Sequence, residues 1–241
     1  MEEVYRSESK QFFEEIYKKN IWKDQSSRSG TGSNMEQTEK IRIHFQEILG
    51  LYEIKSLLDI PCGDFFWMKE IQNNLRIKLT TYVGGDIVEE LIIKNNEYYS
   101  DATFSFKLLD IQASALPKSD LVFCRDCLVH FSYGDIYKSL INIKRSNSRY
   151  FLATTFPGRI NRDIKTGAWR PIDLQKFPFY FPKPNLIYQE SCSEFKNQFS
   201  DKSLALWKIK NLGLSKFRIF LFLISVYRKI ILMIIRVKSI Y

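Results

Sequence analysis

The chain has 241 residues, enough for one α/β domain with appendages, and its 45% hydrophobic content can fill a sizeable core. Four cysteines over this length exclude a disulfide scaffold, and the composition excludes collagen-like and disordered chains. The net charge of +9 lies in the C-terminal region: residues 202–241 hold nine Lys or Arg and no acid, whereas residues 1–201 hold 27 of each sign. This neutral body argues against a nucleic-acid enzyme, which carries basic side chains across its folded surface.

The N-terminal region predicts helices that precede the main domain. The first residues are charged and no apolar run follows them, so we expect no secretory signal and a cytoplasmic location. Residues 8–22 space apolar side chains as an amphipathic helix does, residues 26–34 are a loop of small residues, and a second helix is expected at about 35–50. Residues 1–50 therefore predict a helical cap.

Strands and helices alternate through the middle of the chain, which predicts an α/β fold with a mostly parallel sheet and helices on both faces. Apolar strands are expected at about 55–60, 80–86, 104–110, 120–124 and 149–156. The clearest helices are expected at 64–75, 88–98 and 133–145. Two later strands, 185–191 and 203–212, predict an antiparallel hairpin at one edge of the sheet. Residues 51–212 are thus expected to form a single domain.

Three acidic residues, Asp59, Asp86 and Asp110, end the first three predicted strands. Open α/β sheets bind ligands at the carboxyl ends of their strands. Gly63, in the loop after the first strand, permits close approach of a ligand to the backbone, and the Asp86 carboxylate can accept both hydroxyls of a ribose. Each aspartate alone would be explained as a cap of a turn or helix. Three aspartates, each at the end of a predicted strand, together predict a cofactor site.

The loop after the first strand distinguishes between two kinds of cofactor. Dinucleotide enzymes normally use G-x-G-x-x-G there, because a pyrophosphate lies against backbone amides at the start of the helix. Here the loop carries Pro61, a single glycine, Phe65 and an additional carboxylate, Asp64. This suits a ligand with a cationic sulfonium, such as S-adenosylmethionine (SAM). A nucleotide-dependent oxidoreductase and a non-catalytic SAM-binding or membrane-scaffold protein remain the alternatives.

Four motifs carry a resemblance to a known family. They are L-D-x-P-C-G-D-x-x-W-M at 58–68, G-x-D-I-V at 84–88, C-R-D-C-L-V-H at 124–130 and T-G-x-W-R-P at 166–171. Together they resemble class I SAM-dependent methyltransferases, in particular a bacterial group, over about residues 21–212. The first motif departs from the wider pattern D-x-G-x-G-x-G of this class.

The resemblance implies a Rossmann-like sheet and SAM as the cofactor. It implies that Asp59 and Gly63 line the methionine end of SAM, Asp86 the ribose, and Asp110 with Ile111 the adenine. Further cofactor contacts are expected from neighbouring motif residues: Cys62, Asp64, Ile87 and Arg125.

The segment after the fourth predicted strand is expected to lie beside the transferable methyl group. Methyl transfer needs alignment of the nucleophile, and a general base only where a hydroxyl must lose its proton. Asp126 and His130 are the candidate bases, although Asp126 could equally hold the SAM amino group and His130 could equally pack beneath the site or cap a helix. Cys124, Cys127 and His130 also spell C-x-x-C-x-x-H, but zinc needs further ligands, so we predict no metal.

The acceptor side is expected between residues 157 and 184, where aromatic side chains alternate with hydrogen-bonding groups. Arg159, Asp163, Trp169 and Arg170 are the candidate contacts, with Arg170 suited to a phosphate or carboxylate. A lid closing the edge of the core is the alternative. We expect O-methylation of a saccharide or a lipid-linked glycan.

Residues 213–241 form a basic, apolar tail. Arg228 and Lys229 split its two apolar runs, and neither run reaches the roughly 20 residues that span a bilayer. The tail predicts an amphipathic helix over 214–241 that lies on an anionic membrane surface, which would make the enzyme peripheral at the inner face of the membrane. A helix docked on the core or on a partner subunit is the alternative.

Overall fold

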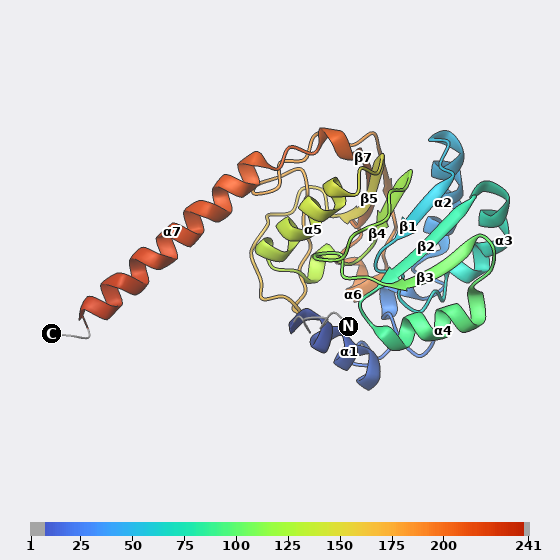
Figure 1. The fold of residues 1–241 in the computed structure, drawn as a ribbon, viewed down its shortest axis with the longest axis horizontal. Helices are drawn as coiled ribbons and strands as arrows, with labels where there is room; N and C mark the ends of the chain where they lie inside the picture. Colours follow the sequence, from blue (N-terminus) through green and yellow to red (C-terminus); the bar gives the residue numbers. More distant parts are fainter. Residues whose placement is uncertain (1–7, 239–241) are drawn as a thin grey trace.

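The computed structural model describes residues 8–238 and contains one seven-stranded sheet in the order β3-β2-β1-β4-β5-β7-β6 (Figure 1). The first five strands are parallel, and their bounds are β1 Ser56–Asp59, β2 Thr81–Asp86, β3 Phe104–Leu108, β4 Leu121–Cys124 and β5 Tyr150–Thr155. Each lies within about one or two residues of its predicted span. The order reverses between β1 and β4, which is where open α/β sheets bind their ligands.

The last two strands, β6 Leu186–Gln189 and β7 Ser203–Lys208, form the predicted antiparallel edge. β7 pairs antiparallel with β5, placing Ala205 opposite Ala153, and β6 pairs with the outer side of β7. The expectation of a mostly parallel sheet with an antiparallel hairpin at one edge is confirmed.

Alternate residues of the strands face two separate layers of core. In β4, Leu121 and Phe123 point to one side, and Val122 and Cys124 point to the other, following the period of two in an extended chain. Helices α2 Glu39–Leu51 and α3 Met68–Lys78 cover the first face. Helix α5 Tyr133–Arg145 covers the second, together with the start of α7 Ser215–Lys238.

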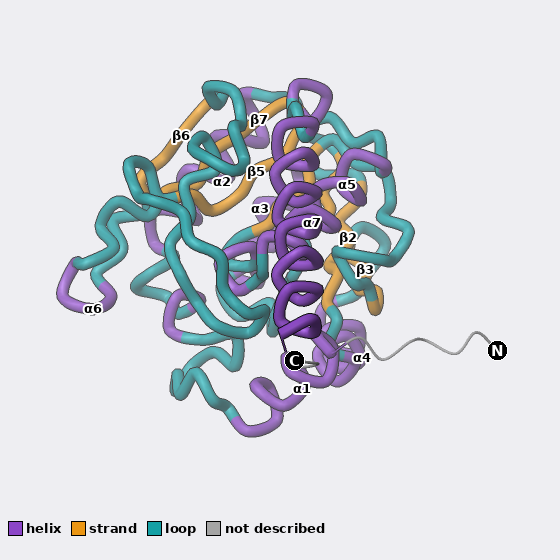
Figure 2. The backbone as a smooth tube through the Cα atoms, turned by 90° about the vertical axis from the view of Figure 1, so that its left-hand side faces the viewer, coloured by secondary structure: helices purple, strands orange, loops and turns teal. Residues whose placement is uncertain are grey.

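Two more helices lie near the carboxyl ends of the parallel strands. Helix α4 Glu89–Tyr99 follows β2, and α1 Glu8–Lys19 packs beside its first turn, where Tyr17 contacts Val88 and Leu91 (Figures 1 and 2). The predicted helix at 64–75 begins at Met68, because residues 61–67 form the loop that follows β1. A short helix, α6 Glu194–Asn197, lies in the β6–β7 connection.

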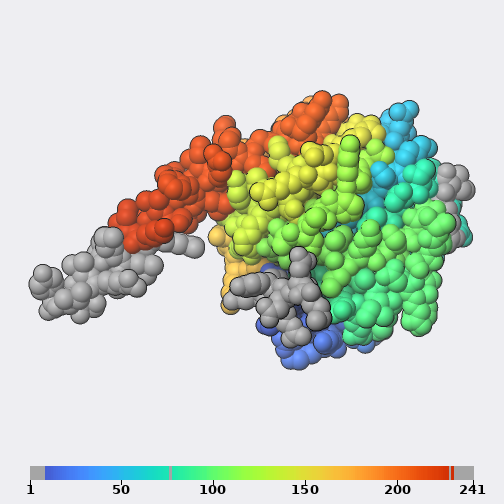
Figure 3. All heavy atoms as spheres, viewed as in Figure 1, coloured from blue at the N-terminus to red at the C-terminus, as the bar shows by residue number. Residues whose placement is uncertain are grey.

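The tail is helical from Ser215 to Lys238, and most of α7 extends away from the body (Figures 1 and 3). Residues 239–241, with which the predicted tail ends, lie outside the described part of the chain. Within residues 8–238, no helix combines the length and the hydropathy that a bilayer crossing requires.

Candidate active site

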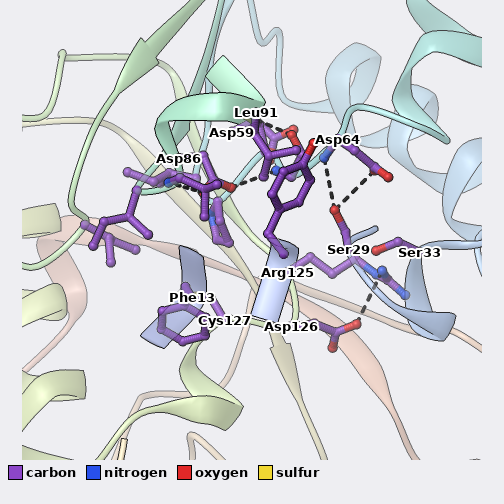
Figure 4. Close-up of a pocket in the computed structure, with 18 of the residues that line it drawn as sticks. Phe13, Ser29, Ser33, Asp59, Asp64, Asp86, Leu91, Arg125, Asp126 and Cys127 are labelled. Atoms are coloured by element: carbon purple, nitrogen blue, oxygen red, sulfur yellow. Dashed lines mark hydrogen bonds and ion pairs between the residues drawn. The ribbon is translucent and has the colours of Figure 1, made fainter. Parts of the chain in front are cut away.

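An open cavity of about 1100 Å³ lies at the carboxyl ends of the parallel strands (Figure 4). It is lined by every residue that the sequence assigned to the cofactor or to catalysis: Asp59, Cys62, Gly63, Asp64, Asp86, Ile87, Asp110, Ile111, Arg125, Asp126 and His130. These residues come from four segments that are far apart in the sequence, and the sheet brings these segments to one edge.

Asp86, the last residue of β2, is buried and oriented by two backbone amides. Its Oδ2 accepts from the Gly63 N–H at 3.0 Å, and its Oδ1 accepts from the Val88 N–H at 2.9 Å. Burial raises the pKa of Asp86 to about 6, although these amides oppose the shift. Each oxygen keeps a further lone pair, so the carboxylate can still accept two hydroxyl donors from a ligand.

Asp59, the last residue of β1, is held by a tyrosine. The Tyr82 hydroxyl donates to its Oδ2 at 2.5 Å, and both side chains are buried. Burial raises the pKa of Asp59 to about 7; the Tyr82 hydrogen bond opposes this shift, and the nearby Asp86 adds to it. A cation bound in the cavity would favour the ionised form of both carboxylates.

The loop after β1 depends on Gly63, which has a φ of 56° and lies against the N-terminal loop. A Cβ at this position would lie 2.2 Å from Ser29 Oγ, a distance that no side chain can occupy without a shift. The Gly63 carbonyl accepts from the Asn95 side chain at 2.8 Å, which ties the loop to α4. The same Asn95 amide lies 3.8 Å from the Cys62 sulfur.

Asp64 lines the cavity, but its carboxylate is already occupied by the N-terminal loop. It accepts from the Ser27 hydroxyl at 3.0 and 3.1 Å, the Arg28 N–H at 2.7 Å and the Ser29 hydroxyl at 3.1 Å. Asp64 therefore fastens the loop of small residues over the cavity (Figure 4). This differs from the free acidic contact that the sequence suggested.

The N-terminal segment contributes a whole wall of the cavity, which the sequence did not predict. Its lining residues include Phe13, Tyr17, Trp22, Arg28 and Ser33. The unusual run of small residues at 26–34 was the available signal, but local sequence carries no information on where such a loop docks.

Asp110 and Ile111 follow β3 at the far end of the cavity. The Asp110 Oδ1 accepts from the Gln112 N–H at 2.8 Å, so this carboxylate also caps a turn. The Ile111 side chain is buried beside it, and the Ile111 carbonyl accepts from Asn142 on α5. Ile111 thus gives the cavity an apolar wall beside the Asp110 carboxylate.

Beyond β4, Arg125 and Asp126 belong to a network of four charges, in which Asp126 is partly exposed and the other three side chains are buried. Arg125 lies 2.9 Å from Glu190 and 3.3 Å from Asp126, and Lys202 lies 2.5 Å from Asp126 and 3.5 Å from Glu190. Burial alone would raise the pKa of Asp126, but Lys202 and Arg125 outweigh it and lower the value to about 2. A carboxylate held ionised by two cations accepts a proton poorly, so Asp126 is the weaker of the two candidate bases.

His130 ends a 3-10 turn, and its ring faces the cavity beside Trp22, whose ring centroid lies 5.4 Å away. Burial lowers the pKa of His130 to about 4, which keeps the imidazole neutral at physiological pH. Its Nδ1 lies 3.2 Å from the Ala168 carbonyl, an acceptor only, so Nδ1 carries the ring proton. Nε2 is then left with a free lone pair, the form that a general base requires.

A second cavity of about 970 Å³ adjoins the first and shares Trp22, Ser29, Asp126 and His130 with it. Its other walls are the aromatic side chains of Phe156, Trp169, Phe195 and Phe199, with Glu194 and Lys202 as charged groups. Phe195 and Lys196, in the short α6, have φ values of 50° and 56°. Of these residues, the sequence had singled out Trp169 for acceptor binding.

The other three predicted acceptor contacts line neither cavity. Arg170 is completely buried, and its guanidinium donates to the carbonyls of Leu128, Val129, Phe131 and Arg162. The expectation that Arg170 holds an acceptor anion is wrong, because the backbone around His130 already uses its donors. Asp163 accepts from the Tyr133 N–H at 2.7 Å and so caps α5, and Arg159 pairs with Asp201 at 2.6 Å.

Within residues 8–238, no cluster of three or more His, Cys, Asp or Glu side chains has the arrangement of a metal site. Cys124 and Cys127 are buried, and burial together with a contact to Cys124 raises the pKa of the Cys127 thiol.

No model of a known protein family matches the chain, and no curated protein sequence matches it. Solved structures do match its fold. NodS, an N-methyltransferase of Bradyrhizobium japonicum solved with S-adenosyl-L-homocysteine, aligns over 84% of this chain and 98% of its own, with a TM-score of 0.56 and 11% identity. A SAM-dependent methyltransferase of Leishmania major aligns over 83% of both chains, with a TM-score of 0.58 and 14% identity.

The magnesium protoporphyrin IX methyltransferase of Synechocystis, solved with bound SAM, covers 84% of this chain and 97% of its own, with a TM-score of 0.52 and 14% identity. At these identities the likeness concerns the fold. The chain has the Rossmann-like fold of class I SAM-dependent methyltransferases, as its motifs led us to expect.

Proposed function

We propose that this protein is a SAM-dependent methyltransferase that transfers a methyl group to a hydroxyl of a saccharide. The observation that carries the proposal is the convergence of Asp59, Asp86 and Asp110 on one cavity at the switch point of the sheet. Fold alone does not assign an activity, so the argument rests on what these side chains can bind.

The cavity suits SAM in charge and in hydrogen-bonding capacity. Burial raises the pKa of both Asp59 and Asp86, and a sulfonium or amino group in the cavity would favour their ionised forms. Asp86 has lone pairs for two ribose hydroxyls. When bound, SAM would supply a methyl group activated by its positive sulfur.

The chain's own groups would orient and deprotonate the acceptor. His130 lines both cavities and presents a neutral Nε2, so it would take the proton of an acceptor hydroxyl held in the second cavity. Trp22, Trp169 and Phe199 offer flat aromatic faces for the apolar side of a sugar ring, and Glu194 can accept from its hydroxyls. Asp126, held by Lys202 and Arg125, would remain an anion beside the reacting groups.

A lipid-linked form of such a glycan would be reached at a membrane surface. The basic C-terminal helix is the feature that supports this form of the acceptor. We therefore place the protein at the cytoplasmic face of a membrane.

Calorimetric titration of SAM and S-adenosylhomocysteine tests the cofactor directly. We expect micromolar binding of both, and a loss of at least about tenfold for Asp86→Asn, since one ionic acceptor of the ribose hydroxyls becomes a neutral amide. Glu97→Gln, an exposed change on α4, is the matched control and should bind as the unchanged protein does. Absence of binding in folded protein would rule out the proposal.

A further inference from the structure

Helix α7 is fixed to the body only at its first turns. Phe217 is fully buried, with its ring centroid 5.1 Å from that of Phe179 and 5.4 Å from that of Tyr137. Phe220 packs against Phe177 at 4.6 Å. Beyond this root the helix leaves the body and projects outward (Figures 1 and 3).

One side of α7 beyond its first turns is apolar and exposed. Six large side chains recur at intervals of three or four residues and are 38% to 66% exposed: Ile219, Phe222, Leu223, Val226, Tyr227 and Ile230. This spacing places them along one side of the helix, and we call them the apolar stripe. A continuous stripe of this kind on a soluble protein marks an interaction surface.

Cations flank the apolar stripe, and no acid is present to balance them. Lys216, Arg218 and Lys229 are exposed, and Arg218 and Lys229 lie about three turns apart on the same side of α7. From residue 202 to the C-terminus the sequence holds no Asp or Glu, whereas the rest of the chain is electrically balanced. The positive charge is therefore a local property of the segment that carries the exposed apolar side chains.

We propose that α7 binds the surface of an anionic lipid bilayer, with the apolar stripe in the interface and the flanking cations on lipid headgroups. An apolar face bordered by Lys and Arg is the pattern of an interfacial helix, and each cation near an anionic leaflet adds to the attraction. A second copy of the chain is a poorer occupant, because it would bring one uncompensated cationic helix against another.

The direction of α7 relates this surface to the active site. In two views turned by 90° about the vertical axis, its distal end lies level with α1 (Figures 1 and 2). Helix α1 forms part of the wall of the SAM cavity through Phe13 and Tyr17. Lipid binding through α7 would keep the body, with its SAM cavity, at the bilayer surface. This consequence, unlike lipid binding itself, rests on the proposed function.

Flotation of the full chain with lipid vesicles tests the proposal. We expect flotation with vesicles of phosphatidylcholine and phosphatidylglycerol, and none with phosphatidylcholine alone. Binding should be lost in NaCl at about 1 M, where the screening length falls to about 3 Å. Phe222→Glu/Leu223→Glu should abolish flotation, and Arg218→Glu/Lys229→Glu should weaken it by about 25-fold or more, at roughly fivefold per cation.

Matched substitutions on the body distinguish an effect of α7 from a general effect of surface charge or surface hydrophobicity. Leu51→Glu/Ile93→Glu replaces two equally exposed apolar side chains, and Lys107→Glu/Lys118→Glu reverses two exposed cations; both should float as the unchanged protein does. Equal flotation with neutral vesicles would overturn the proposal. So would a dimer that Phe222→Glu/Leu223→Glu dissociates while vesicles are not bound. SAM titration of the same variants should be unchanged, so failure of the cofactor assignment is read out separately.

Discussion

The ionisable groups of the cavity differ in charge state although they lie close together. Asp126 is paired with Lys202 and Arg125 and stays ionised, whereas Asp59 and Asp86 are buried and have pKa values raised to about 7 and about 6. His130 is half-buried next to a carbonyl, and its lowered pKa keeps it neutral. The environment of each group, and not its residue type, decides which one can take up a proton at neutral pH.

The first residue-scale prediction concerns stability. In the unfolded chain Asp59 ionises near its ordinary pKa of 3.8, but in the folded protein it keeps its proton to about pH 7. The folded state therefore binds more protons between these values, and the free energy of unfolding should fall as pH rises from about 4 to about 7. Asp59→Asn should flatten this slope and stabilise the ligand-free protein above pH 7. Urea denaturation over this pH range measures the slope, and Glu97→Gln on the exposed face of α4 should leave it unchanged.

The second residue-scale prediction concerns catalysis. If His130 is the general base, His130→Gln should lower kcat by roughly 10²- to 10⁴-fold while leaving the Kd of SAM nearly unchanged. Because the pKa of His130 is about 4, the unchanged enzyme should hold a plateau of activity above about pH 5 and lose activity as pH falls toward 4. Stopped-time methylation assays with a saccharide acceptor would measure both. A variant with full kcat would show that His130 only packs beside the site.

At the scale of elements, the connections between strands build the site. The loop after β1 contacts the N-terminal loop through Asp64. The Arg170 guanidinium donates to the Leu128 carbonyl in the turn after β4. These contacts position the segments that carry Gly63 and His130, and both residues line the first cavity. The carboxyl ends of the strands set the position of the cavity, and the loops that follow them supply most of the side chains that line it.

The element-scale prediction concerns Arg170. Arg170→Met would remove the guanidinium donor from the carbonyls of Leu128, Val129 and Phe131, of which Leu128 and Val129 keep a backbone donor, and each hydrogen bond lost from a charged group costs about 1.5–3 kcal/mol. We expect a loss of at least about 3 kcal/mol in the free energy of unfolding, measured by urea denaturation. Arg162→Met, at an exposed site eight residues earlier, should stay within about 0.5 kcal/mol. A higher KM for the acceptor in Arg170→Met, with no loss of stability, would instead show that Arg170 contributes to acceptor binding.

At the scale of the whole molecule, a neutral α/β body carries a cationic helix that joins its core at one end. Phe217 belongs to the core between α5 and the sheet, whereas residues farther along α7 are exposed. We propose that the first two turns of α7 are part of the folded domain and that the free tail begins after them. This places the start of the tail a few residues beyond 213, the position suggested by the sequence.

The whole-molecule prediction tests this division of α7. Phe217→Ala should destabilise the protein by about 3–5 kcal/mol, because it opens a cavity among Tyr133, Tyr137 and Phe179. Phe222→Ala, five residues along the same helix, should change the free energy of unfolding by less than about 0.5 kcal/mol. Equal effects in thermal or urea denaturation would contradict the proposed boundary.

The sequence by itself determined the strands, most helices, the antiparallel edge, and the acids at or just after the ends of β1, β2 and β3. These follow from local rules: apolar periodicity marks an element, and the carboxyl ends of parallel strands meet at one edge. Only the tertiary structure decided which polar groups remain available to a ligand. Asp64 meets Ser27 across 37 residues, Arg170 meets Leu128 across 42, and Asp126 meets Lys202 across 76. A buried charge takes its partner from whatever packs against it, and that choice depends on the arrangement of the whole chain in space.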